Sequence, residues 1–121
     1  METKQLLEIY YRGLARKQGW EAVISEDFKF VGGDMTKNTP IVGKANYIAI
    51  IDRFSRLFAT MRVKQMIVEQ DQACVIANYD YAFPNGIAIS GDVAEIWKVK
   101  GGTLDALTIF FDTLTFQNNT R

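Results

Sequence analysis

The sequence contains no histidine, and this absence excludes several kinds of active site. Ser-His-Asp and Cys-His nucleophilic sites both need an imidazole, as does any metal site built on histidine. The single cysteine, Cys74, excludes an intramolecular disulfide and a zinc site made of several cysteines. We therefore expect no metal and no organic cofactor, and we expect Cys74 to be a buried, unreactive thiol.

Long apolar runs and an excess of one charge are missing as well. No run approaches the roughly 18 apolar residues that a membrane-spanning helix needs, and the first residues lack the basic-then-apolar pattern of a signal peptide. Fourteen basic residues balance fourteen acidic ones and are dispersed, so we expect neither nucleic acid nor a membrane surface as a partner. A soluble cytoplasmic protein is the expectation.

The chain has the length and composition of one globular domain. Its 121 residues are 48% apolar, which is enough to build a core. We therefore predict a single domain over residues 1–121, with loose termini at about 1–4 and 116–121.

Hydrophobic periodicity predicts helices first and strands afterwards. A helix is expected between Thr3 and Gly19, followed by a helical turn at 20–24 and a second long helix over 45–58. Between them, 28–31 alternates like a short strand and 35–43 reads as a loop. Four further strands are expected over 61–70, 73–83, 87–100 and 103–111. This order predicts an α+β protein in which the helices cover one face of an antiparallel sheet.

The strand at 73–83 is apolar on both of its faces. One alternation contains Cys74, Ile76, Asn78, Asp80 and Ala82, and the other contains Val75, Ala77, Tyr79, Tyr81 and Phe83. We expect Ile96, Thr108 and Phe110 to join the second set. Because two helices cover only one face, the apolar face left over predicts a homodimer through the outer face of the sheet. The alternative is that the sheet curls and buries part of that face within the monomer.

The chain resembles the nuclear transport factor 2-like superfamily, and within it the SnoaL-like group with its ketosteroid isomerase and limonene-epoxide hydrolase relatives. The resemblance rests on the segment 11–28, on Gly43 before the second helix, on 94–99 with the Gly-Gly turn that follows, and on 110–112. It implies a cone-like curved antiparallel sheet, with the N-terminal helices packed on its concave face around a pocket, in a fold that is commonly dimeric. This fold hosts enzymes, binding modules and adaptors, so no single activity follows.

The resemblance also implies which residues face the pocket. They are mostly aromatic or aliphatic, which suits a small apolar or aromatic ligand. Besides the candidate acid and base groups, the implied lining contains Phe30, Gly32, Ile76, Asn78, Val93, Trp97, Ile109 and Phe111.

Three polar positions carry the chemistry that the resemblance implies. Tyr11 matches the oxyanion tyrosine of the isomerase, and Glu95 matches its protonated oxyanion acid. Asp80 matches a catalytic aspartate of the epoxide hydrolase relatives. If Asp80 and Glu95 share one cavity, their charges repel, and one would serve as base while the other stays protonated as acid.

The departures from these two patterns keep the function open. The general base of the isomerase falls on Gly32, so Asp34, two residues further, is a candidate for a displaced base. The hydrolase pattern needs an arginine and a second aspartate where this chain has Asn78 and Ile109. Two hypotheses follow. The first is an isomerase, cyclase or hydrolase that uses carboxylate acid–base chemistry on a small apolar or cyclic substrate. The second is a non-catalytic ligand-binding or dimerisation module, and the sequence does not decide whether the protein is an enzyme.

Overall fold

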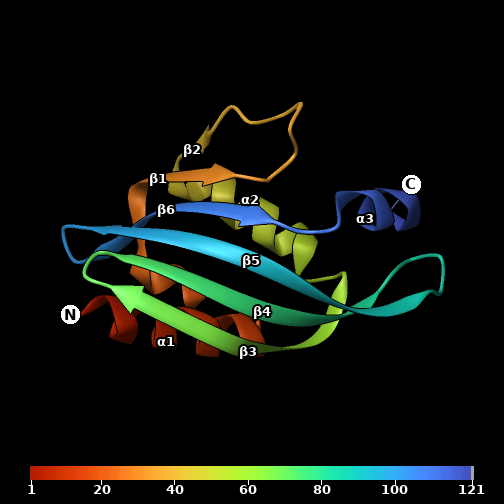
Figure 1. Ribbon diagram of the computed structural model, residues 1–121, viewed down its shortest axis with the longest axis horizontal. Helices are drawn as coiled ribbons and strands as arrows, with labels where there is room; N and C mark the ends of the chain where they lie inside the picture. Colours follow the sequence, from red (N-terminus) through yellow and green to blue (C-terminus); the bar gives the residue numbers. More distant parts are fainter. Residues whose placement is uncertain (121) are drawn as a thin grey trace.

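Over residues 1–120, which the computed structural model describes, six strands form one mixed sheet in the order β2-β1-β6-β5-β4-β3 (Figure 1). The confirmed α+β class follows from this sheet and the helices that accompany it. Along the chain the elements are α1 (Thr3–Arg16), the 3-10 helix η1 (Trp20–Val23), β1 (Ile24–Val31), β2 (Ile41–Val42), α2 (Lys44–Phe54), β3 (Phe58–Glu69), β4 (Gln72–Ala82), β5 (Ala88–Lys100), β6 (Thr103–Phe110) and α3 (Thr113–Asn119).

Helices α1 and α2 lie on the same face of the sheet, behind it in the view of Figure 1. The helical spacing of the apolar residues in α1 buries one stripe, which includes Leu6, Tyr10 and Leu14. Gly13 lets η1 pack closely, because a Cβ there would lie 2.4 Å from the backbone nitrogen of Trp20. The helix ends at Arg16, with Lys17 in the left-handed conformation. This face of the sheet, called the inner face below, therefore holds the core.

Strand β1 makes the sheet mixed rather than purely antiparallel. It begins at Ile24, earlier than its alternating residues predict, and it pairs parallel to β6, with Phe30 opposite Leu107. Its other edge pairs with the short β2, where the sequence predicts only a loop. Both differences come from contacts between residues far apart in the chain, which a local pattern does not record. The fold nevertheless has the predicted arrangement, with the helices on one face of the sheet.

The C-terminal segment is a helix where the sequence predicts a loose tail from residue 116. Asp112 accepts a hydrogen bond from the backbone nitrogen of Thr115 at 3.0 Å and so caps the start of α3. The ring of Phe116 then packs edge-on against Phe111 and Tyr81. The helix thus places an aromatic side chain against the inner face. The last residue of the predicted tail, 121, lies outside the described residues.

Candidate functional site

The hairpin of β4 and β5 decides which side chains face the interior. Its pairs are symmetric about Asn85, so odd-numbered residues face odd-numbered ones: Val75 lies opposite Glu95 and Ala77 lies opposite Val93. Glu95 and Val93 point inward, and cross-strand partners share a face. The odd residues of β4 are therefore the inner ones, and the prediction that Asn78, Asp80 and Ile76 face the pocket is wrong. The Pro84-Asn85-Gly86 turn could have predicted this arrangement. A hairpin centred on Asn85 pairs odd-numbered residues of β4 with odd-numbered residues of β5, so they share a face.

Between the helices and the inner face lies a cavity of about 390 Å³. Its volume falls in the range typical of small-molecule sites, and most of its wall is aromatic or aliphatic. Helix α2, strands β4 to β6 and the C-terminal segment all contribute to it. The lining residues are Tyr10, Phe30, Gly32, Tyr47, Ile50, Ile51, Arg53, Phe54, Leu57, Tyr79, Tyr81, Val93, Glu95, Leu107, Ile109, Phe111, Phe116 and Thr120.

Glu95 is the buried acid of this cavity, and its side chain is held by two phenols. Tyr11 donates a hydrogen bond to Oε1, and Tyr79 donates to Oε2 at 2.8 Å. Burial raises the pKa of Glu95 to about 7, although the two phenol hydrogen bonds act in the opposite direction. Glu95 can therefore take up and release a proton near neutral pH.

Tyr11 supports Glu95 instead of facing a ligand. Its hydroxyl donates its one proton to Glu95 and accepts from Nε1 of Trp97 at 2.8 Å. Burial raises the pKa of Tyr11 well above its ordinary value, so this proton stays in place. Tyr11 and Trp97 are absent from the cavity wall and lie behind it. Tyr11 already donates its hydroxyl proton to the carboxyl group of Glu95, so it has no second proton with which to stabilise an oxyanion.

A second polar pair lies in the cavity wall. The hydroxyls of Tyr10 and Tyr47 are 2.6 Å apart and share one hydrogen bond. Burial raises the pKa of both phenols, so both carry a proton. One proton lies between the two oxygens, and the other has no acceptor among the described residues. This pair can therefore donate a hydrogen bond to a ligand oxygen.

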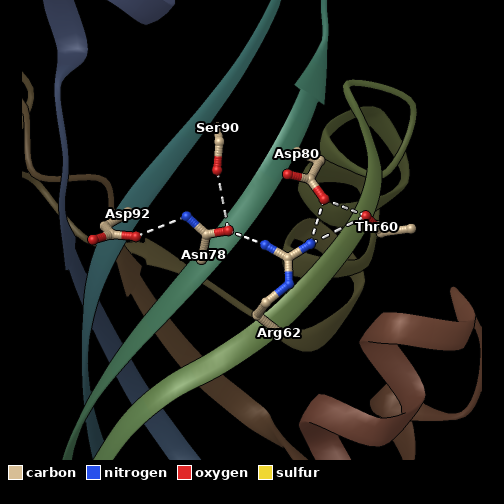
Figure 2. A network of polar contacts seen from close by, with 6 residues as sticks. All are labelled: Thr60, Arg62, Asn78, Asp80, Ser90 and Asp92. Carbon is tan, nitrogen blue, oxygen red and sulfur yellow. Dashed lines mark hydrogen bonds and ion pairs between the residues drawn. The ribbon is translucent and has the colours of Figure 1, made fainter.

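Asp80 lies on the opposite, outer face of the sheet. Figure 2 shows it beside Thr60 and Arg62, which both contact its Oδ2 atom, while Asn78 contacts Arg62 and accepts from Ser90. The hydrogen bond from Thr60, followed by that from Arg62, lowers the pKa of Asp80 below its ordinary range. The prediction that Asp80 and Glu95 share one cavity is wrong, because the sheet itself separates them.

The same network continues across the outer face to β5. Asn78 donates to Asp92 at 2.8 Å, and Lys64 forms an ion pair with Asp92 at 2.9 Å. Figure 2 shows Asp92 on the far side of Asn78 from Arg62. Asn78 therefore belongs to a surface network and does not line the cavity, contrary to its predicted role in ligand binding.

The other predicted site residues divide between the cavity and the surface. Phe30, Val93, Ile109 and Phe111 line the cavity, as does Gly32. Asp34 lies half-buried in the loop after β1, where it accepts hydrogen bonds from the backbone nitrogen and the hydroxyl of Thr36. These bonds lower its pKa. Asp34 is a turn residue here and not part of the cavity wall.

Sequence reasoning missed most of the aromatic wall. Tyr10 precedes the predicted Tyr11 and lies on the same apolar stripe of α1. The stripe alone therefore does not show which of the two tyrosines lines the cavity. Tyr47 and Phe54 belong to the apolar positions that give α2 its helical period, and this pattern does not distinguish core residues from residues of a cavity wall. Tyr79 and Tyr81 were placed on the wrong face. Cys74, predicted to be buried, is half-buried on the outer face.

Residues 1–120 contain neither a metal-ligating cluster nor a membrane-spanning helix. This part of the chain contains no group of three potential metal-ligating acidic or cysteine side chains. Its helices are also too short or too polar to cross a membrane.

Known structures share this fold with little sequence identity. An NTF2-like protein of unknown function from Burkholderia pseudomallei superposes with a TM-score of 0.81 at 18% identity, over 96% of this chain and 95% of that one. A candidate SnoaL-like polyketide cyclase from Jannaschia sp. gives 0.82 at 17% identity, over 98% and 92%. TerC, in a structure co-crystallised with polyporic acid, gives 0.80 at 18% identity, over 96% and 95%.

No protein-family model matches the sequence, and no curated protein matches it either. The structural similarity extends over nearly all of the chain, whereas identities of this size carry information on the fold and none on a specific activity. The structure therefore confirms the resemblance to the nuclear transport factor 2-like superfamily, with SnoaL-like proteins among the similar structures, at the level of the fold.

Proposed function

We propose that this protein binds a small apolar or cyclic molecule in the inner-face cavity and that Glu95 transfers a proton on it. The observation that carries the proposal is the position of Glu95. It is the one carboxyl group among the described lining residues, it is buried, and its pKa is about 7. A group with this pKa gives and takes a proton near neutral pH at low free-energy cost.

The surrounding hydroxyls suit a reaction that passes through an enolate. The Glu95 carboxylate takes a proton from a carbon next to a carbonyl group, and the electron pair left behind moves onto the carbonyl oxygen. The free proton of the Tyr10–Tyr47 pair is available to that oxygen. Tyr11 and Tyr79 hold the carboxyl group in place while its charge changes.

A single acid favours isomerisation or cyclisation over hydrolysis. In an isomerisation, Glu95 returns the same proton to a different carbon, so the reaction needs no second base and no second reactant. With Asp80 and Asp34 outside the cavity wall, the described lining supplies no other carboxyl group to activate water. Glu95 therefore takes the role of the base that the sequence predicts for Asp80 or Asp34.

The test uses 2-tetralone, a cyclic ketone with acidic carbon-bound protons, as the probe. Binding is measured by thermal shift, and proton exchange into D2O is measured by NMR. We expect the wild type to accelerate exchange as pH rises through about 7, and Glu95→Gln to bind the probe without accelerating exchange. An equal acceleration by both proteins would contradict the acid–base role.

The second candidate is a non-catalytic binding module of the same fold. The observation that favours it is the glycine at position 32, where the related isomerases are expected to carry their base and where this cavity has no side chain. Binding of 2-tetralone by both proteins with no acceleration by either would support this candidate. The co-crystallisation of TerC with polyporic acid supports small-molecule binding under both candidates.

We also propose that the protein forms a homodimer through the outer face of the sheet. One half of this face is apolar: Ile67, Ile96 and Phe110 are 58%, 40% and 53% exposed. The register places Ile67, Cys74, Ile96 and Thr108 in one row across the sheet. Exposed apolar area of this kind favours burial against a partner.

A second copy of the chain is the partner that fits this face best. The polar half pairs Arg62 and Lys64 with Asp80 and Asp92, so its charges balance and two copies do not repel each other. Sedimentation velocity is expected to give a dimer for the wild type and a monomer for Phe110→Asp. A monomeric wild type at about 100 μM would contradict the proposal.

A further inference from the structure

Arg53 is the second charged residue in the wall of the inner-face cavity. It lies in the last turn of α2, its side chain is exposed, and it lines the same cavity as the buried Glu95. Glu95 thus marks the inner part of the cavity and Arg53 the rim, where the cavity meets solvent. The two are not an ion pair, and no carboxylate within residues 1–120 forms a salt bridge with Arg53.

The wall between these two residues is apolar. Phe54 follows Arg53 directly and Leu57 lies four residues after it, and both belong to the cavity lining together with Phe116 and Ile109. The neighbouring charged residues of this segment, Asp52 and Arg56, are exposed and are not part of the wall. Apart from phenols, Arg53 and Glu95 are the titratable groups that the described wall presents to a ligand.

This arrangement discriminates between ligands by charge. A guanidinium at the rim attracts an anionic group and binds it through hydrogen bonds in a fixed geometry, while a cationic group is repelled. An anion deep in the cavity would lose its hydration and approach the carboxyl group of Glu95, which disfavours that orientation. The apolar body of an anionic ligand is therefore directed inward, with its anionic group at Arg53.

We propose that the ligands of this cavity are small apolar molecules with one anionic group, such as aryl or cyclic carboxylates, and that Arg53 binds the anion. This inference deepens the proposed function and rests on it, because it names the ligand class for the same cavity. It also defines the orientation: the part of the ligand opposite the anion lies toward Glu95 and the Tyr10–Tyr47 pair.

Three probes of similar size and different charge test this inference. They are 2-naphthoate, neutral 2-naphthamide and the cation 2-naphthylmethylammonium, titrated calorimetrically at about pH 7.5. We expect the wild type to bind 2-naphthoate about fivefold or more tightly than 2-naphthamide, the size expected for a partly exposed ion pair, and the cation most weakly. The preference for the anion is expected to shrink at high salt concentration.

The variant Arg53→Gln is expected to bind 2-naphthoate and 2-naphthamide about equally. Arg56→Gln is the matched control: it removes the same charge three residues away, outside the cavity wall, and is expected to keep the wild-type preference. The same loss of preference in both variants would overturn the inference, because it would show a general effect of net charge.

The outcomes separate this inference from the proposed function on which it rests. Binding of 2-naphthamide by the wild type with no preference for 2-naphthoate overturns the role of Arg53 alone. Tighter binding of the cation also overturns it. Failure of all three probes to bind overturns the proposed function together with this inference, because the cavity would then not accept small aromatic molecules.

Discussion

The two faces of the sheet shift the pKa of a carboxyl group in opposite directions. On the inner face, burial raises the pKa of Glu95 to about 7. On the outer face, hydrogen bonds from Thr60 and Arg62 lower the pKa of Asp80. Both residues belong to the same hairpin, and the residue next to Asp80, Tyr79, contacts Glu95. A shift of one residue in strand parity therefore decides whether a carboxyl group lies buried in the cavity wall or pairs with a guanidinium on the outer face.

The difference comes from how each face compensates a charge. The Glu95 carboxylate is buried and receives hydrogen bonds only from neutral phenols, so its charge is poorly compensated. Asp80 is exposed to water and pairs with a guanidinium, so its charged form is favoured. Three substitutions test this comparison, and the largest effect is expected on the inner face.

Trp97→Ala is expected to destabilise the fold by about 3–5 kcal/mol, because a fully buried indole leaves a cavity behind it. The hydrogen bond from Trp97 to Tyr11 is lost as well. The matched control is Ile96→Ala, one residue away on the outer face, which is expected to cost no more than about 1 kcal/mol. Urea unfolding at a concentration that keeps the chain monomeric measures both. Similar losses for the two variants would contradict the assignment of faces.

Glu95→Gln is expected to remove a pH dependence of stability. Because the folded state holds the Glu95 proton up to a pKa of about 7, against an ordinary value of 4.5, the folded state binds more protons between these values. The free energy of unfolding of the wild type therefore falls as pH rises through this window, by about 3 kcal/mol relative to the variant. Denaturant unfolding from about pH 4 to pH 8 measures this difference, and parallel curves would show that Glu95 ionises normally.

Asp80→Asn is expected to have the smallest effect. Its ion pair with Arg62 is exposed and screened by water, so only a small loss of stability is expected, and added salt should reduce that loss further. Binding of 2-tetralone in the inner-face cavity is expected to stay unchanged, since the sheet lies between. A loss of probe binding comparable to that of a cavity-wall variant would mean that the two faces are coupled.

Much of the fold could be predicted from local patterns. The stripe of apolar residues in α1, the helical period of α2 and the turns at 84–86 and 101–102 place the helices and the long hairpins, because each depends on neighbours in the chain. The parallel pairing of β1 with β6 and the edge strand β2 could not be predicted in this way. These pairings join segments more than ten residues apart, and the chain carries no local signal for them.

The candidate site was also predicted only in part. The resemblance predicts that Glu95, Phe30, Phe111 and Asp80 all face the cavity, and it is wrong for Asp80. The pattern of strand β4 could not correct this, because both of its faces are apolar. A helix over 113–119 was missed even though Asp112 precedes Thr115 at the spacing of a helix cap.

By itself, the sequence determined which side chains no site can contain, histidine above all, and where the long helices and hairpins form, because composition and periodicity act through each residue and its near neighbours. Only the tertiary structure decided that Glu95 meets Tyr11 and Tyr79, while Asp80 meets Arg62. The physical reason is that a side chain's solvation depends on which face it occupies. Strand register and the helices packed across the sheet fix that face.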